Sequence, residues 1–227
     1  YIAALDIGTS KVVCLIGSIS DSHSIEIVAM GSYPSSGLKK GVVVNIDATT
    51  DAIQKSIEQA KNSFEGKIKN VFVGIAGNHI KSLNSHGIVG IKDKEVTQLD
   101  IEKVIDAAQA VAIPSDQRVL HVLPQEFVID DQDAIREPLG MSGVRLESHV
   151  HLVTCANNAI QNIEKCVKRC GIGIDGFVLE QLASSYSILS NDEKELGVCI
   201  VDIGGGTTDI AIFNNGSICF TGVIPIA

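Results

Sequence analysis

The chain has 227 residues, 45% of them hydrophobic, and a mean hydropathy of +0.25, which predicts one large or two small folded domains and excludes a disordered chain. Its formal net charge of −9 and pI near 5.1 argue against a surface that follows nucleic-acid phosphates, so nucleic acid is not an expected partner. No uninterrupted apolar stretch approaches the ~20 residues that span a bilayer.

The first segments of the chain predict β-strands. Residues 1–5, 11–19 and 25–33 alternate or run apolar, with turns expected at Gly8 and at Asp21-Ser22, a pattern typical of a three-stranded meander. The chain opens directly in a strand, without an initiator Met or a basic leader region. We expect such a chain to be trimmed to a domain edge and not secreted.

A helix and a buried strand are predicted next. Asp47 is the expected N-cap of the helix, before Ala48. Residues 71–76 are fully apolar, as in strands buried within mixed or parallel sheets. The helical spacing itself is carried by Ile46, Ile53, Ile57, Ala60 and Phe64.

From about residue 77 to residue 155 the pattern changes to strand, helix, strand, strand. Strands are predicted over 79–91, 118–130 and 144–153, and an amphipathic helix over 97–112, where Thr97 and Asp100 resemble a capping box. We expect this block to close a small core of its own, separable from the rest. The polar loop 130–143 is either a solvated connection or an edge on which a partner docks.

The remaining elements return to alternating helices and strands. A helix is expected after Asn157-Asn158, ending at Gly171 as the C′ residue. A strand follows over 173–179, and Glu180 begins another helix that runs to residue 189. Residues 191–195 are expected to form a charged linker.

Two glycine segments far apart share one order of residues: an apolar strand, Asp, an apolar residue, Gly, then Thr, then a further strand. They are Asp6-Ile7-Gly8-Thr9-Ser10-Lys11 and Val201-Asp202-Ile203-Gly204-Gly205-Gly206-Thr207-Thr208-Asp209. Such an echo is what two structurally repeated half-domains leave in a sequence. Neither segment matches the P-loop or the dinucleotide-binding fingerprint.

Taken alone, the triple-glycine turn is more typical of a plain hairpin. Two facing turns would instead offer backbone amides to a phosphate from both sides. The Asp at the head of each turn suits a Mg²⁺ ion that keeps most of its waters. The pair of turns therefore indicates the actin-like ATPase fold.

The cysteines and histidines leave two alternatives open. Cys166 and Cys170 lie one helical turn apart, either as a metal-binding pair or as half-buried reduced thiols. His149 and His151 share one face of a predicted strand with Glu147, either as metal ligands or as solvated or core histidines. The six cysteines contain no Cys-x-x-Cys motif, which predicts a reducing, cytoplasmic setting.

Beyond the two turns, several stretches carry a family resemblance: Gly37-Leu38-Lys39-Lys40-Gly41-Val42, Arg118-Val119-Leu120-His121-Val122, Pro124-Gln125-Glu126, Leu139-Gly140-Met141-Ser142-Gly143-Val144-Arg145, Leu182-Ala183-Ser184-Ser185-Tyr186-Ser187 and Glu195-Leu196-Gly197-Val198-Cys199. The order of parts resembles the actin, Hsp70 and sugar kinase superfamily. Within it, the whole chain is most similar to the FtsA family of bacterial cell-division proteins. The turns mark only the superfamily, whereas the Pro-Gln-Glu and Gly-Met-Ser-Gly-Val-Arg stretches are specific to FtsA.

This resemblance implies an α/β chain with the actin-like (ribonuclease H-like) ATPase fold and an inserted strand-helix-strand-strand subdomain, called 1C and of the SHS2 type. The implied division is subdomain 1A over 1–77 and 156–196, subdomain 1C over 78–155, and the start of subdomain 2A over 197–227.

The resemblance also implies site residues for ATP and Mg²⁺. Asp6 and Asp202 would hold Mg²⁺ through water. Glu180 lies where related ATPases orient the attacking water, although an ordinary helix-start Glu favoured by the dipole is an equal alternative. The β-phosphate side would be cradled by Gly8, Thr9, Ser10 and Lys11, and the γ side by Gly204, Gly205, Gly206 and Thr207.

For function, the resemblance implies a non-enzymatic, ATP-binding scaffold that polymerises at the inner face of the cell membrane, tethers FtsZ and contacts other division proteins through residues 78–155. The adenosine-binding glycines and the amphipathic membrane helix of the family are expected beyond residue 227. Two alternatives stay open. One is a sugar or acetate kinase of the same fold, and the other is an Hsp70-like chaperone or pilus-assembly relative.

Overall fold

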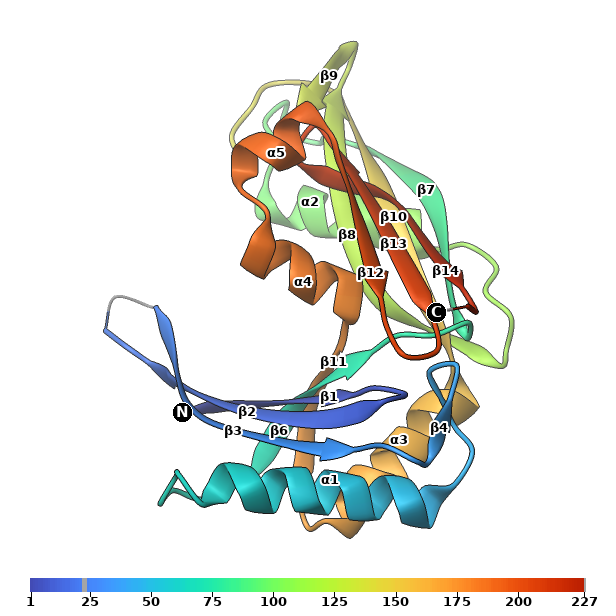
Figure 1. Ribbon diagram of the computed structural model, residues 1–227. Helices are drawn as coiled ribbons and strands as arrows, with labels where there is room; N and C mark the ends of the chain where they lie inside the picture. The colour runs from blue at the N-terminus through green and yellow to red at the C-terminus, as the bar shows by residue number, and fades with distance from the viewer. Residues whose placement is uncertain (22–23, 227) are drawn as a thin grey trace.

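The computed structural model describes residues 1–21 and 24–226, and in this part of the chain it contains five helices and fourteen strands (Figure 1). The larger sheets have five, four and three strands, and the segment that forms the four-stranded sheet is inserted between β6 and β11 of the five-stranded sheet. A two-stranded hairpin, β4 (Leu38–Lys39) and β5 (Val42–Val43), precedes the first helix.

The five-stranded sheet has the order β11-β6-β1-β2-β3. The antiparallel ladder of the first three strands confirms the expected meander, although Ser22 of the expected turn lies outside the described residues. The apolar strand β6 pairs in parallel with both β1 and β11, as its composition predicts. The strands are β1 (Ile2–Ile7), β2 (Lys11–Ile19), β3 (Ile25–Pro34), β6 (Asn70–Ile75) and β11 (Gly173–Leu179).

Two helices, α1 (Ile46–Lys61) and α3 (Asn157–Arg169), cover one face of this sheet (Figure 1). Asp47 is not the N-cap of α1. The extended residue Asn45 takes that place, because its side chain accepts a hydrogen bond of 3.0 Å from the Ala48 N–H. Asp47 lies inside the first turn, where its charge favours the helix dipole, and it pairs with Arg169 at 2.7 Å.

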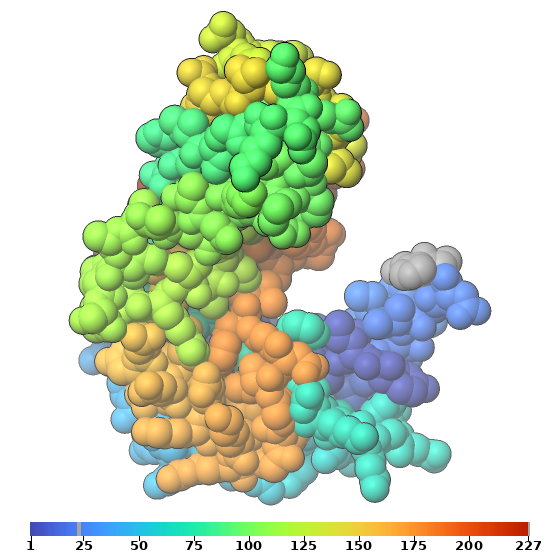
Figure 2. All heavy atoms as spheres, turned by 180° about the vertical axis from the view of Figure 1, so that it is seen from behind, coloured from blue at the N-terminus to red at the C-terminus, as the bar shows by residue number. Residues whose placement is uncertain are grey.

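The opposite face of the five-stranded sheet is more open. The helix α4 (Glu180–Ile188) packs beside β6 and β11, and Ala4, Leu15 and Phe72 line a groove of about 380 Å³ next to it. Toward the other edge, Met30 on β3 is 62% exposed. The blue strands β2 and β3 project from the body of the molecule, away from its upper part (Figure 2).

Residues 78–155, called the insert below, form an antiparallel sheet of order β7-β10-β8-β9 with α2 against one face. Thr97 and Asp100 make the predicted capping box at the start of α2. The elements are β7 (Ile80–Gly90), α2 (Gln98–Gln109), β8 (Gln117–Ile129), β9 (Gln132–Ile135) and β10 (Arg145–Ala156).

The loop 130–143 is not a plain solvated connection. Residues 132–135 return as β9 and pair with β8, and this turn buries Ile135 in a small apolar cluster with Phe127 and Leu146. A lone apolar residue among several acids gave no strand periodicity, so the tertiary contact decides the structure here.

The insert is only partly separable. Its upper apolar clusters are its own, around Val104 and around Leu152. Its base is not, because Ile80, Val153 and Cys155 are buried in the core of the five-stranded sheet. The expectation of a separable core is therefore wrong at this end of the insert.

The last sheet, called the third sheet below, has the order β12-β13-β14, with strands β12 (Val198–Ile203), β13 (Thr208–Asn214) and β14 (Ser217–Ile224). The expected linker 191–195 is instead a short helix, α5 (Asn191–Leu196). It is stabilised by a capping box between Ser190 and Glu193. Among residues 1–21 and 24–226, none of the helices combines the length and the apolar character that a membrane crossing requires.

Candidate functional site

The two glycine turns have the same backbone geometry. In the first turn, residues 8–11 connect the paired residues Ile7 and Val12, and the Gly8 N–H donates to the Lys11 carbonyl at 3.0 Å. In the second turn, residues 204–207 connect Ile203 and Thr208, and the Gly204 N–H donates to the Thr207 carbonyl at 2.9 Å. The sequence echo is thus an echo in structure, made by four-residue hairpin turns on two different sheets.

These turns face each other at close range (Figure 1). A Cβ atom added to Gly205 would lie 2.8 Å from the Cβ of Ser10, and one added to Gly206 would lie 3.0 Å from the Cγ2 of Thr9. Such distances are shorter than van der Waals contact. The lack of side chains at Gly205 and Gly206 therefore allows the second turn to lie directly against Ser10 and Thr9 of the first turn.

A cavity of about 500 Å³ opens between the turns. Every residue that the sequence assigned to the site lines it except Gly206, which lies against Thr9 and Lys40. Additional lining comes from Gly41, whose N–H donates to Thr9 Oγ1 at 3.2 Å, and from Ala76. The predicted residues in the wall are Asp6, Gly8, Thr9, Ser10, Lys11, Glu180, Asp202, Gly204, Gly205 and Thr207.

Asp209 is a site residue that the sequence reasoning missed. It lies directly opposite Asp202 in the β12–β13 ladder and is buried in the cavity wall. Both of its carboxylate oxygens are fixed, Oδ2 by the Thr207 hydroxyl at 2.8 Å and Oδ1 by the Gln181 amide at 3.0 Å. The available signal was an acid in an otherwise apolar strand.

Glu180 reaches the cavity from the first turn of α4. A Cβ atom on Gly74 of β6 would lie 3.2 Å from Glu180 Cγ, so the glycine makes room for this side chain. Burial, followed by the charges of Asp6, Asp209 and Asp202, raises the pKa of Glu180 to about 8. This carboxyl group is consequently protonated for most of the time at neutral pH.

The pKa values of two neighbouring acids, Asp6 and Asp209, are shifted in the same direction. Desolvation raises the pKa of Asp6, with Asp202 adding to the shift and Lys11 opposing it. Burial likewise raises the pKa of Asp209, while the Thr207 hydroxyl favours its charged form. The cavity thus concentrates negative charge around Asp6, Asp202 and Asp209 with Lys11 as a partial counterion.

The residues present fit a nucleotide phosphate with a hydrated divalent cation. Two glycine turns expose backbone N–H groups to a phosphate. The carboxylates of the cavity outnumber its positively charged groups, which suits Mg²⁺. Within the described ranges, no three His, Cys, Asp or Glu side chains converge closely enough to ligate a metal ion directly. Hard cations that keep several waters do not require such a group.

The other candidate residues take structural roles. Burial raises the pKa of the Cys170 thiol to about 11, and its sulfur lies 3.4 Å from the Cys166 carbonyl, as expected for a reduced thiol. His151 is buried and hydrogen-bonded, whereas His149 is only partly covered.

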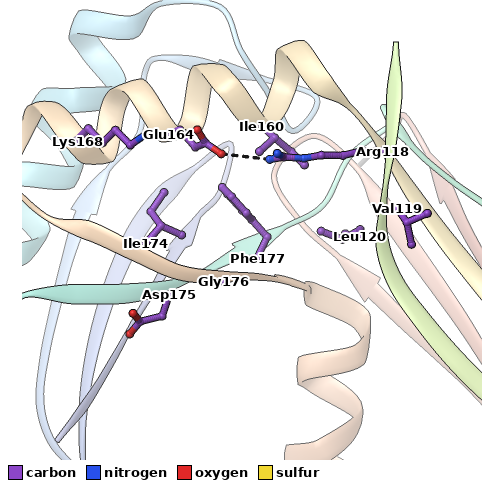
Figure 3. Close-up of a pocket in the computed structure, with 10 residues that line it drawn as sticks. All are labelled: Arg118, Val119, Leu120, Ile160, Glu164, Lys168, Ile174, Asp175, Gly176 and Phe177. Atoms are coloured by element: carbon purple, nitrogen blue, oxygen red, sulfur yellow. Dashed lines mark hydrogen bonds and ion pairs between the residues drawn. The ribbon is translucent and has the colours of Figure 1, made fainter. Parts of the chain in front are cut away.

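A second groove, of about 430 Å³, lies where the insert meets the five-stranded sheet (Figure 3). Arg118 of β8 extends along it to Glu164 of α3, at 3.2 Å. The opposite wall is the edge strand β11, with Ile174 and Phe177. The groove therefore combines the charged side chains of Arg118 and Glu164 with apolar side chains of the edge strand β11.

The sequence is similar to a known domain family and to several known proteins. Residues 77–154 match the family model described as the SHS2 domain inserted in FtsA. The chain is 66% identical over 226 residues to the cell division protein FtsA of Pseudomonas aeruginosa and 45% identical to that of Escherichia coli, covering 100% of this chain in both cases. It spans about half of these relatives, 54% of each.

Among solved structures, the PilM-PilN type IV pilus biogenesis complex is similar with a TM-score of 0.71 at 14% identity, over 99% of this chain and 61% of that one. At such identity the likeness concerns the fold alone. The expected fold is confirmed: an actin-like ATPase fold with an SHS2 insertion. The insertion has one strand more than expected, β9.

Proposed function

We propose that this chain, which is similar over its whole length to proteins named cell division protein FtsA, binds ATP with Mg²⁺ and acts as an actin-like scaffold in cell division. The two facing glycine turns carry the nucleotide part of this proposal. The sequence relatives carry the division part, since each is named a cell division protein.

Each turn would bind a different side of the phosphate chain. The first turn, Gly8 to Lys11, offers its amides and the Lys11 ammonium to the β-phosphate, and the second turn, Gly204 to Thr207, offers its amides to the γ-phosphate. Asp6 and Asp202 would hold Mg²⁺ through its waters, and bound Mg²⁺ would neutralise phosphate charge. Asp209 joins them as a third acid in the same wall.

Glu180 would orient water or a phosphate oxygen near the γ side. Burial and the neighbouring acids raise its pKa when no cation is bound, and bound Mg²⁺ would oppose this shift. We propose a scaffold with slow hydrolysis at most. A kinase would need a positioned base and a second substrate beside the transferred phosphate.

The scaffold proposal divides the chain into subdomain 1A (1–77 and 156–196), subdomain 1C (78–155) and the start of subdomain 2A (197–227). Self-association, tethering of FtsZ and a peripheral position at the inner face of the membrane are proposed for the whole protein. Recruitment of other division proteins is proposed for the insert. The groove of Figure 3 supports this role, because Arg118, Val119 and Leu120 of the insert form one of its walls.

A thermal-shift experiment tests the nucleotide site. Mg²⁺ and ATP at ~100 times the dissociation constant should stabilise the protein by ~2.7 kcal/mol. Asp202→Ala should abolish that gain, whereas Asp93→Ala, a change of an exposed acid in a loop of the insert, should preserve it. Equal stabilisation of the Asp202→Ala variant would mean that the phosphate site is assigned wrongly.

A coupled assay against common sugars and acetate separates the scaffold from a small-molecule kinase of the same fold. Turnover that requires one of these substrates would replace the scaffold proposal with the kinase. Its absence, together with ATP-dependent sedimentation of the protein, would support the scaffold.

A further inference from the structure

The insert and the third sheet are joined by a polar contact surface, called the seam below. His151 lies at its centre: its Nδ1 is 2.7 Å from Asn84 Oδ1, and its Nε2 is 3.1 Å from Thr221 Oγ1. Ser82 donates to the Thr221 carbonyl at 3.1 Å. On the insert side the seam consists of Ser82, Asn84, Gln125 and His151, and on the β14 side of Ser217, Ile218, Cys219 and Thr221.

Further hydrogen bonds make the seam continuous along β14. Asn84 Nδ2 donates to the Cys219 carbonyl at 3.2 Å, and Gln125 Nε2 donates to the Ile218 carbonyl at 2.9 Å. The Ser217 hydroxyl returns a bond of 2.9 Å to the Gln125 carbonyl. β14 thus lies against the sheet face of the insert that α2 leaves open, as Figure 1 also shows.

The hydrogen bonds of the seam do not extend to the histidines farther along β7 and β10. His149 and His86 are paired across β10 and β7, two residues along the ladder from the His151–Asn84 pair. They lie outside the seam. His151 is 2% exposed, whereas His86 is exposed and His149 is half-buried. Two histidines on one strand and one face therefore differ mainly in whether they meet β14.

A second contact joins the same two parts. Arg136, just after β9, reaches the Glu195 carboxylate and the Asn215 carbonyl in the turn before β14. These side chains are about half exposed, so the ion pair contributes little to stability. Its main effect is to fix the position of β9 relative to the third sheet.

The seam leads directly to the nucleotide cavity. Thr221 is paired with Ala211 of β13, two residues after Asp209, and β13 begins immediately after Thr207 of the second turn. The first turn, in contrast, belongs to the five-stranded sheet, into whose core the base of the insert is anchored through Ile80 and Val153. The insert therefore bridges the two parts of the molecule that carry the two phosphate turns.

We propose that the insert is the mechanical link between nucleotide occupancy and partner binding, with the seam as its point of attachment to the third sheet. A γ-phosphate held by both turns would fix the position of the third sheet relative to the five-stranded sheet. Separating His151 from Thr221 would leave buried polar atoms without partners, so the part of the insert above its anchored base follows the third sheet. Because coupling between two binding sites is reciprocal, a partner that binds the insert should also change the affinity for nucleotide. This inference rests on the proposed nucleotide site.

Hydrogen–deuterium exchange with and without Mg²⁺ and ATP tests the link. In the wild-type protein we expect ATP to protect the turn 204–207 and to change exchange in β7 and α2 of the insert. His151→Ala should lose the response in the insert while the turn stays protected. The matched variant His149→Ala, on the same strand and face, should respond as wild type does.

Thr221→Val provides a second, nearly isosteric cut of the seam if His151→Ala does not fold, and it should lose the response in the same way. An unchanged response of the insert in either seam variant would overturn the proposal, as would a wild-type insert that ignores ATP while the turn is protected. A turn that ATP never protects would instead show that the nucleotide site itself is assigned wrongly.

Discussion

Gln181 Nε2 donates a hydrogen bond of 3.0 Å to Asp209 Oδ1, and this buried contact joins the first turn of α4 to the strand that follows the second glycine turn. Glu180 is the preceding residue, so one contact sets the distance between two acidic groups of the cavity. Asp209 receives its other hydrogen bond from Thr207, which belongs to the turn itself.

Gln181→Leu should lower the free energy of unfolding by about 1–3 kcal/mol, because a buried carboxylate loses one of its two side-chain donors. Urea denaturation measures the change. Gln54→Leu is the matched control, since Gln54 also donates to a carboxylate at 3.0 Å, that of Glu58, but on the exposed face of α1. It should cost under about 0.5 kcal/mol. Equal losses would show that the buried contact has no special weight.

Gly205→Ala should weaken binding of ATP with Mg²⁺ at least ~10-fold, equal to ~1.4 kcal/mol, because the new Cβ would clash with Ser10 and displace one turn from the other. Nucleotide titration followed by fluorescence measures the affinity. Adding Ser10→Gly to this variant should restore part of the binding, since it removes the atom that the Cβ meets. Gly90→Ala is the control, because no heavy atom lies within 4 Å of its added Cβ. If Gly205→Ala binds ATP with full affinity, the close contact between the two glycine turns is not needed for nucleotide binding.

The protein should lose stability as the pH falls from 7 to 5, in part through His151. Burial lowers the pKa of this histidine from 6.5 to about 4. Between these two pH values the histidine is protonated in the unfolded chain but mostly neutral in the folded chain, so acid favours unfolding. The loss from this group should be about 2 kcal/mol at pH 5 and should level off only below about pH 4. Unfolding of His151→Leu at both pH values isolates this contribution, since the variant should show a smaller drop between them. Identical drops would mean that His151 is accessible to protons in the folded state.

Much of the fold could be predicted because its signals are local. The boundaries of β2 and β11 agree with the sequence, and the Thr97 capping box is present. The two glycine turns could be paired because each repeats the same residue order. Where a competing local signal existed, the wrong one was chosen: Asn45 precedes Asp47 as a helix cap, and Ser190 with Glu193 starts a helix inside a charged stretch.

Other features depend on contacts that no local pattern contains. Ile135 becomes part of a strand because Phe127 and Leu146 bury it. Asp209 becomes a site residue because Gln181, 28 positions earlier, is brought beside it. Whether the base of the insert is separable depends on Ile80 and Val153 entering another core, which alternation in β7 and β10 cannot reveal.

Replacing the whole insert, residues 78–155, with a short Gly/Ser linker should prevent stable folding. The main core then loses Ile80, Val153 and Cys155, and the loss of a buried Ile side chain alone costs about 2–5 kcal/mol. Replacing only residues 85–150 with a turn of the same composition should be tolerated much better. Asn84 and His151 are paired neighbours, so such a turn closes a short β7–β10 hairpin that keeps Ile80, Val153 and the contact of His151 to Thr221, although Leu120 and Leu123 of β8 are lost from the edge of the main core.

The two replacements separate the roles of the insert. The shorter one should keep ATP binding, because both phosphate turns and their supporting sheets remain, and it should lose self-association and contacts with division partners, because the distal surfaces are gone. Nucleotide titration and sedimentation on the same sample measure both properties. If the complete replacement folds and binds ATP as well as the shorter one does, the buried base of the insert is dispensable. If polymers persist while ATP binding is lost, the insert completes the nucleotide site, as the substrate domain of a kinase would.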